Sequence, residues 1–425
     1  MSAFAIASGI KWLFLDLNSY FASVEQQEYP DLRGEPVAVV PAMTDSTCAI
    51  AASYAAKAYG IKTGTKIWEA KKMCPRLRIV PARHDIYVDY HHRILDEIAR
   101  HIPITKTWSI DEVSCRLPPK YRDIDAARDL AFRIKEGIRK NVGDAITCSI
   151  GLAPNSFLAK VASDMQKPDG LTILPSENLP GRLFDLKLDD FPGIGANMLR
   201  RLNNAGIYKT ENLWNISPKH ARKIWGSVAG ERFWYNLRGF DVPDLEEGQK
   251  RMVGHSRVLD PQLRAPEPAR LIARRLVMKA AQRMRRLNLH ATTFRLGVRT
   301  VDNRKWAAEI RTQAADDTAA FLSLLSVLWN GMIRDIGPTH FRKLSISMQG
   351  LREPAQITPD LFDTRNAETV KRHNNLARLS LTMDRLNQRF GANTVSLGTT
   401  PATQSGYVGT KIAFSRIPDR AEFCE

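Results

Sequence analysis

The chain opens with an apolar run at residues 12–15 that leads into a carboxylate, Asp16, and then a short polar break. Four consecutive apolar residues bounded by such a break predict a buried strand. Tyr20 and Phe21 begin a stretch whose pattern predicts a helix. Because the first backbone N–H groups of a helix lack intrahelical partners, this junction can bind a cation through Asp16 and an anion through the helix start. The alternative is an aspartate that only caps the helix.

Strand-like and helix-like patterns alternate through roughly the first 175 residues. The helix expected at 84–101 is the longest of them, and its apolar positions lie near one face. Further strands are expected at 35–40, 48–51, 77–80, 105–109, 113–117 and 145–152, and further helices at 53–59, 65–73, 125–141 and 155–165. Strands interspersed with helices predict an α/β or α+β domain.

The pattern changes after residue 180. Residues 180–239 are predicted to be helical with short breaks, and the acidic stretch 241–248, which contains Pro and Gly, is predicted to be a linker. A basic helix near 270–286 and alternating strands at 292–300 and 342–349 then predict a second α+β unit. Beyond about residue 350 the chain is polar, with one helix expected at 367–390.

Composition narrows the class of partner. The 425 residues carry a net charge of +17, with a pI near 9.8. Such a charge suits a polyanion, with nucleic acid first and an anionic membrane surface second. No run of 18 apolar residues occurs, so no membrane-spanning helix is expected. The five cysteines are scattered without a Cys-x-x-Cys pair, which indicates reduced thiols in a cytosolic protein.

A second acidic cluster, Asp111 and Glu112, lies at a tight turn between two short predicted strands. At such a turn both carboxylates can approach one site, and Asp16 ends another strand. Three carboxylates from two strand ends are typical of a site for two Mg²⁺ ions, which prefer carboxylate oxygen and keep positions for substrate phosphate. Two such ions can stabilise the attacking and the leaving oxygen of a phosphoryl transfer. A polar hairpin turn without a metal is the alternative.

Two features predict contacts with a phosphate backbone. Gly193 and Gly195 form a Gly-x-Gly turn before a predicted helix that carries Arg200, a pattern that resembles a helix-hairpin-helix motif. The free N–H groups of such a turn can bind phosphate without reading a base. Residues 251–300 contain 12 Lys and Arg against 2 Asp and Glu, and Arg274 and Arg275 lie in a basic helical stripe there. An ordinary glycine turn and a solvated helix face are the respective alternatives.

Together these motifs resemble those of the Y-family DNA polymerases, the translesion enzymes of the DinB type. The resemblance covers about residues 12–350 and rests on LFLDLNSYFASVE, SYAAKAYGIKTG, WSIDEVSCRL, SIGLAPNSFLAKVASDMQKPDG and LDDFPGIG, which occur in the family's order. It implies template-directed, low-fidelity transfer of a nucleotide from a dNTP to a primer 3′-hydroxyl, in bypass of DNA damage. The implied fold is an α+β right-hand polymerase, with a palm at 1–18 and 82–175, small fingers at 19–81, a helical thumb at 176–241, a linker at 242–251, a little finger at 252–352 and a C-terminal tail at 353–425.

By motif match, the resemblance also implies roles for single residues. Asp16, Asp111 and Glu112 would bind two Mg²⁺ ions together with the backbone carbonyl of Leu17. Phe21 would be the steric gate, whose ring excludes a ribose 2′-hydroxyl. The residues expected to contact the triphosphate are Tyr20, through its backbone N–H, and the side chains of Tyr54, Lys57 and Lys167.

Three positions depart from the family's usual pattern. Lys57 stands where an arginine is usual and lacks its bidentate fork. Ala51 stands where a hydroxyl-bearing residue is usual, and Asn18 replaces the second acid of the opening motif. The first two suggest an alternative function, a catalytically weak or inactive DNA-binding paralogue that serves as a scaffold in a DNA repair complex.

The resemblance implies primed template DNA and a dNTP as partners. A sliding clamp is a further expected partner, because TPDLF, from Thr358 to Phe362, resembles a clamp-binding peptide, although it lacks the leading glutamine. A chance Leu-Phe pair in a polar segment is the alternative. The expected location is the cytoplasm, in association with the nucleoid, without a membrane partner.

Overall fold

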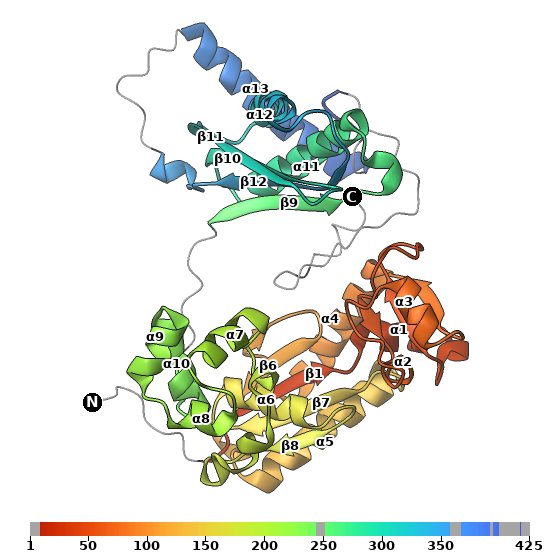
Figure 1. Cartoon of the computed structure of the whole chain (residues 1–425), viewed down its shortest axis with the longest axis vertical. Coiled ribbons are helices and arrows are strands. Elements are labelled where there is room, and N and C mark those ends of the chain that lie inside the picture. The colour runs from red at the N-terminus through yellow and green to blue at the C-terminus, as the bar shows by residue number, and fades with distance from the viewer. Residues whose placement is uncertain (1–8, 244–250, 358–366, 392–393, 399–416, 418–425) are drawn as a thin grey trace. The chain divides into compact units, whose positions relative to one another are not determined.

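The computed structural model describes residues 9–243, 251–357, 367–391, 394–398 and 417 (Figure 1). The chain divides into two compact units, one made mainly of Met1–Asp244 and the other mainly of Leu245–Gly406. Each unit has its own sheets and its own buried apolar core. The expectation of two separate α+β units is therefore met.

Most elements of unit one lie where the pattern predicted them and α4 coincides with the predicted range, but β8 was not predicted and β3 overlaps its predicted range by one residue. Its strands are β1 (Trp12–Leu17), β2 (Val37–Val40), β3 (Ala51–Ala52), β4 (Arg78–Pro81), β5 (Lys106–Thr107), β6 (Glu112–Arg116), β7 (Cys148–Ala153) and β8 (Leu171–Ile173). Its helices are α1 (Tyr20–Glu28), α2 (Tyr54–Lys57), α3 (Ile67–Met73), α4 (His84–His101), α5 (Ile124–Asn141), α6 (Ser156–Met165), α7 (Ala196–Asn204), α8 (Thr210–Asn215), α9 (Pro218–Trp225) and α10 (Val228–Leu237).

The first strand of the chain lies at the centre of a five-stranded sheet with the order β5-β6-β1-β7-β8 (Figure 1). β1 is antiparallel to both of its neighbours. Its apolar run alternates between two cores. Leu13 and Leu15 pack in the core that contains α4 and α5, whereas Phe14 packs in the core that contains α6. Asp16, two residues after Phe14, therefore lies on the α6 side of the sheet.

Two smaller groups of elements complete unit one. A three-stranded sheet, in the order β3-β2-β4, packs with α2 and α3 around a small core that includes Val40, Ile61 and Ile67. Helices α7 to α10 follow in the chain and contribute Leu202 and Phe233 to the core that contains α6. Cysteines 48, 74, 115 and 148 are free thiols, as the sequence indicated.

Unit two is a four-stranded antiparallel sheet in the order β11-β10-β12-β9 (Figure 1). Its strands are β9 (Met252–Val258), β10 (Ala291–Thr300), β11 (Lys305–Ala315) and β12 (Phe341–Gln349), and its helices are α11 (Pro266–Arg286), α12 (Thr318–Ile336) and α13 (Ala367–Phe390). The sequence pattern predicted β10, α11, β12 and α13 but not β9, β11 or α12. Because α13 contacts α11 and α12, residues 367–390 are part of this unit.

Among the described helices, α12 is the one that is long and apolar enough to cross a membrane, by length and composition alone. Phe321, Leu325 and Trp329 of this helix are buried in the core of unit two. α12 is therefore a core helix of unit two.

Candidate functional site

The structure brings Asp16, Asp111 and Glu112 together at one end of the five-stranded sheet. The pairing of β1 with β6 sets Asp16 directly opposite Glu112, and the Leu17 N–H donates to the Asp111 carbonyl at 2.9 Å. Ser109 Oγ lies 2.5 Å from Asp111 Oδ1 and 3.1 Å from Glu112 Oε2, so one hydroxyl connects the neighbouring carboxylates. Burial, with a contribution from the charges of Asp16 and Glu112, raises the pKa of Asp111.

Two lysine ammonium groups lie among these carboxylates. Lys160 Nζ, on α6, contacts Asp16 Oδ2 and lies 2.8 Å from Glu112 Oε1 and 3.2 Å from Asp164 Oδ2. Lys167 Nζ lies 2.7 Å from Asp16 Oδ1 and 2.8 Å from Asp164 Oδ1. No group of three His, Cys, Asp or Glu side chains in the described part of the chain forms a metal-binding cluster. The two ammonium groups lie where the carboxylates can bind a cation.

Lys160 and Asp164 are functional candidates that the sequence interpretation missed. They are four residues apart and therefore lie on one face of α6, and Lys167 follows three residues after Asp164, beyond the end of the helix at Met165. That spacing was the available signal. Burial disfavours the charge of Lys160, but Asp16, Asp164 and Glu112 outweigh burial and raise its pKa. Lys160 is therefore a cation at neutral pH.

Asn18 has a structural role at one of the three unusual positions. Its Oδ1 accepts from the backbone N–H of Asp169 at 2.8 Å and from Thr147 Oγ1 at 3.2 Å, and its Nδ2 donates to Ser149 Oγ at 3.1 Å. An amide can both accept and donate, which an ionised carboxylate cannot. Because Asp169 is two residues after Lys167, these bonds hold the turn that brings Lys167 to Asp16.

Phe21 is held by aromatic side chains of α4. Its ring stacks on Tyr87 with 4.3 Å between centroids and 14° between planes, and it meets His84 edge-on at 6.0 Å. The buried Tyr87 donates its hydroxyl to Glu25 Oε1 at 2.7 Å. Tyr20 donates its hydroxyl to the Tyr87 carbonyl at 2.6 Å. The Tyr20 side chain is therefore structural, and its backbone N–H is the group at the start of α1.

Tyr54 and Lys57 on α2 lie near the carboxylates. Lys57 Nζ is 4.3 Å from the centre of the Tyr54 ring. Burial, followed by the positive charge of Lys167, lowers the pKa of Lys57, and Asp16 opposes that shift. Burial also raises the pKa of Tyr54. Lys167 and Asp16 are thus among the charges that shift the pKa of both α2 side chains.

The turn that contains Gly193 and Gly195 connects η5 (Leu188–Asp190) to α7. Gly193 has a φ of +91°, which favours glycine. Among the described residues, no atom lies within 4 Å of a Cβ built on either glycine, so the backbone of the turn is open to a ligand. The sequence predicted a helix before the turn, and the structure has one 3₁₀ turn there. Arg200 is exposed on α7.

The basic residues of α11 do not form one stripe. The helical period places Arg275 and Arg283 on one flank and Arg274 and Arg285 on the other. Arg285 pairs with Asp384 of α13 at 2.7 Å, and Arg274 donates to the Leu397 carbonyl at 3.0 Å. The flank of Arg274 is thus engaged by the C-terminal part of unit two. Contacts of Arg274 and Arg275 with DNA stay predictions.

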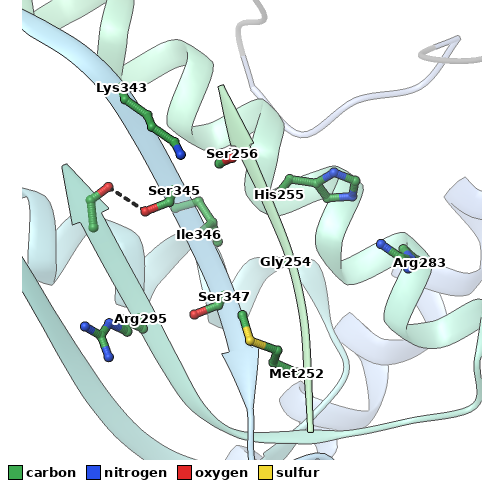
Figure 2. A pocket seen from close by; sticks show the side chains of 11 residues that line it. Met252, Gly254, His255, Ser256, Arg283, Arg295, Lys343, Ser345, Ile346 and Ser347 are labelled. Carbon is green, nitrogen blue, oxygen red and sulfur yellow. Dashed lines mark hydrogen bonds between the residues drawn. The ribbon is translucent and has the colours of Figure 1, made fainter. Parts of the chain in front are cut away.

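A hollow of about 440 Å³ lies on the sheet of unit two (Figure 2). Its lining includes Gly254, Gly297 and Ser345, which are small residues of three neighbouring strands. Arg295 and Lys343 also line it. Small side chains permit close approach of a ligand, and the cations favour an anion such as a phosphate group.

The chain resembles known proteins along most of its length. Residues 15–164 match the impB/mucB/samB family, residues 250–361 match the C-terminal domain of that family, and residues 189–241 match the thumb domain of DNA polymerase-iota. The chain is 32% identical to a DNA polymerase IV of Moorella thermoacetica, over 92% of this chain and 96% of the relative. It is 28% identical to a DNA polymerase IV of Bacillus velezensis, over 90% and 91% of the two chains.

Solved structures share the fold. The chain matches the Y-family DNA polymerase chimera Dbh-Dpo4(243-245)-Dbh with a TM-score of 0.69 and 22% identity, over 81% of this chain and 99% of the chimera. It matches DinB from Sulfolobus solfataricus with a TM-score of 0.51 and 24% identity, over 80% and 98% of the two chains. The α+β architecture predicted from the sequence is therefore confirmed.

Proposed function

The chain belongs to the Y family of DNA polymerases, of the DNA polymerase IV type, and on that basis we propose that Asp16, Asp111, Glu112 and the Leu17 carbonyl hold the metal ions of nucleotidyl transfer. The protein is a DNA-directed DNA polymerase of the translesion type. Such enzymes use metal ions and act on DNA and nucleotide substrates. The observation that carries the residue assignment is that Asp16 and Glu112 converge on the Lys160 ammonium group, with Asp111 joined to Glu112 through the Ser109 hydroxyl.

We propose two Mg²⁺ ions as the metals, because the proposed donors are carboxylate and carbonyl oxygens. Mg²⁺ prefers carboxylate oxygen and is bound by few protein ligands, with substrate phosphates supplying others. Lys160 and Lys167 contact different oxygens of Asp16, so this carboxylate can face two cations. When bound, the ions would stabilise the attacking 3′-oxygen and the leaving pyrophosphate oxygen. The chain itself supplies position, because the β1–β6 pairing holds Asp16 opposite Glu112.

We place the incoming nucleotide between the start of α1 and α2. Ser19 precedes α1 with a φ of +49°, and its backbone leads into the first N–H groups of the helix, which suit a phosphate. Lys167, Lys57 and Tyr54 lie close to the same carboxylates and would contact the triphosphate. Phe21, partly exposed and held by Tyr87, would meet the sugar.

Replacing Lys160 with methionine is expected to lower the melting temperature of the protein in a metal chelator by several degrees. The variant leaves Asp16, Glu112 and Asp164 with less positive charge nearby, a loss on the order of 3 kcal/mol for a largely buried pair. Added Mg²⁺ should stabilise the variant more than the wild type, because it replaces the missing charge. Thermal melting with and without Mg²⁺ measures both effects.

Lys160→Arg, which keeps the charge, is the control and should melt close to the wild type in the chelator. Equal melting temperatures of Lys160→Met and the wild type under both conditions would show that Lys160 does not compensate the carboxylates.

We propose that the Gly193 turn and the hollow of unit two both contact the phosphate backbone of primed DNA. The turn offers open backbone N–H groups at the start of α7, and the hollow offers Arg295 and Lys343. Arg200 lies on the same helix as the turn. None of these groups needs to read a base, which suits an enzyme that copies any template.

Replacing Gly193 with alanine is expected to weaken binding of primed DNA about threefold to tenfold with little change in the salt slope of binding, because the backbone N–H groups of the turn carry no net charge. A methyl group there strains the backbone and narrows the approach to the turn. Gly206→Ala is the matched control, because Gly206 also has a positive φ, of +78°, and open space around it. Equal losses in the two variants, measured by fluorescence anisotropy over a salt series, would remove the turn from the DNA interface.

The remaining assignments follow from family membership. We propose a palm at 1–18 and 82–175, fingers at 19–81, a thumb at 176–241, a linker at 242–251 and a little finger at 252–352, followed by the C-terminal segment. The clamp-binding segment Thr358 to Phe362 lies outside the described residues and stays a proposal. So does a cytoplasmic, nucleoid-associated location.

Single-nucleotide insertion on a primed template with Mg²⁺ tests the proposed function. An active protein should add the templated dNTP. A protein that binds the DNA but inserts nothing would support the alternative, a scaffold in which Lys57 and Ala51 no longer hold the nucleotide.

A further inference from the structure

The proposed fingers carry an exposed tryptophan among lysines on α3. Trp68 is 45% exposed, and the Nζ atoms of Lys72 and Lys66 lie 5.1 Å and 5.8 Å from its ring centre. Trp68, Lys71 and Lys72 are spaced so that they share one face of the helix. Lys66, Trp68, Lys71 and Lys72 are together called the Trp68 surface below. A large exposed aromatic ring surrounded by charge is typical of a binding surface.

The Trp68 surface is held in place by the body of the fingers. Ile67 is buried in the small core of the three-stranded sheet, and its N–H donates to the Thr47 carbonyl at 2.9 Å. The Trp68 N–H donates to the Asp45 carbonyl at 3.2 Å, and Lys71 pairs with the Asp45 carboxylate at 2.6 Å. The ring is therefore presented from a fixed backbone, which lowers the entropy cost of binding.

The charge around Trp68 identifies the class of ligand. Residues 57–78 contain seven Lys and Arg and one acidic residue, Glu69, so this part of the fingers attracts a polyanion. In a duplex the base faces are stacked on one another, whereas an unpaired base can stack on an aromatic side chain. An exposed ring with flanking ammonium groups therefore matches single-stranded nucleic acid better than duplex.

We propose that the Trp68 surface binds the unpaired template strand ahead of the polymerase site, with a base stacked on Trp68 and its phosphates near Lys66 and Lys72. This inference rests on the proposed function, since a primed template is single-stranded beyond the primer end. α2, which carries the proposed triphosphate contacts Tyr54 and Lys57, packs with α3 in the same small core. The Trp68 surface and the proposed triphosphate contacts therefore belong to the same small packed group of elements.

The test compares two primed templates with the same duplex, one with a single unpaired template nucleotide and one with about ten. Binding is measured by fluorescence anisotropy without dNTP, so it does not depend on catalysis. The wild type is expected to bind the long overhang more tightly. Trp68→Ala should lose about fivefold to tenfold of that gain, the usual effect of one stacked base. Trp68→Phe should keep most of it, because it keeps a stacking ring.

A double variant, Lys66→Ala with Lys72→Ala, should reduce the salt dependence of the overhang gain by roughly 1 to 2 in slope. Phe132→Ala is the matched control, because Phe132 on α5 is also an exposed aromatic, at 54%, and should leave the gain intact. Wild-type overhang binding in Trp68→Ala would overturn the proposal, and so would equal weakening on both templates. If the wild type inserts no nucleotide but still binds the long overhang more tightly, the result would contradict the proposed function and not the role of the Trp68 surface.

Discussion

Replacing Asp111 with asparagine is expected to reduce single-nucleotide insertion by about 10³-fold while binding of primed DNA changes little. Of the three carboxylates, Asp111 can be replaced with the least disturbance of ion pairs. It forms no ion pair with Lys160 or Lys167, whereas Asp16 pairs with both. Asparagine keeps the shape of the side chain and can still accept from Ser109, but it lacks the negative charge that a divalent cation requires. Single-turnover insertion and anisotropy, on the same substrate, measure the two quantities.

Asp164→Asn is the matched control for this variant. Asp164 pairs with Lys160 and Lys167 but is not a proposed metal ligand. Its replacement should therefore slow insertion far less, by about tenfold at most. Insertion by Asp111→Asn at the wild-type rate would show that the metal assignment is wrong. Equal, large losses in both variants would instead show that the charge balance of the whole cluster matters, not Asp111 as a ligand.

Replacing Phe21 with alanine is expected to raise the ratio of ribonucleotide to deoxyribonucleotide insertion on the order of 10²-fold, a typical limit for discrimination by the shape of a pocket. The stack on Tyr87, at 4.3 Å, and the edge contact with His84 hold the Phe21 ring in one orientation. A ring held in this way can exclude a 2′-hydroxyl by contact, whereas alanine leaves space for it. Parallel insertion of the matching rNTP and dNTP on one template gives the ratio.

Phe21→Tyr is the control, because it keeps the ring and the stack and should retain most of the discrimination. A ratio unchanged by Phe21→Ala would remove the role of steric gate from Phe21. A fall in insertion of both nucleotides without a change in their ratio would assign Phe21 to general nucleotide positioning.

Local patterns predicted many elements well, and the exceptions have physical causes. α4 and α13 coincide with the predicted 84–101 and 367–390, and in α4 the apolar residues follow the helical period. α12 was not predicted, although it is long and apolar. A helix was expected before the Gly193 turn, and the structure has a 3₁₀ turn there. Its three residues carry too little pattern to distinguish the two kinds of turn from the sequence.

The sequence alone was enough to propose the acidic site, because strand ends and turns are local features that Asp16, Asp111 and Glu112 occupy. Tertiary structure decided which cations meet these carboxylates. Lys160 and Asp16 are 144 residues apart in the chain, and Asn18 reaches the Asp169 backbone across 151 residues. These contacts depend on the register of β1 with β7 and on how α6 packs over the sheet. Local periodicity records which face of an element is apolar, but it does not record which distant charge lies against that face.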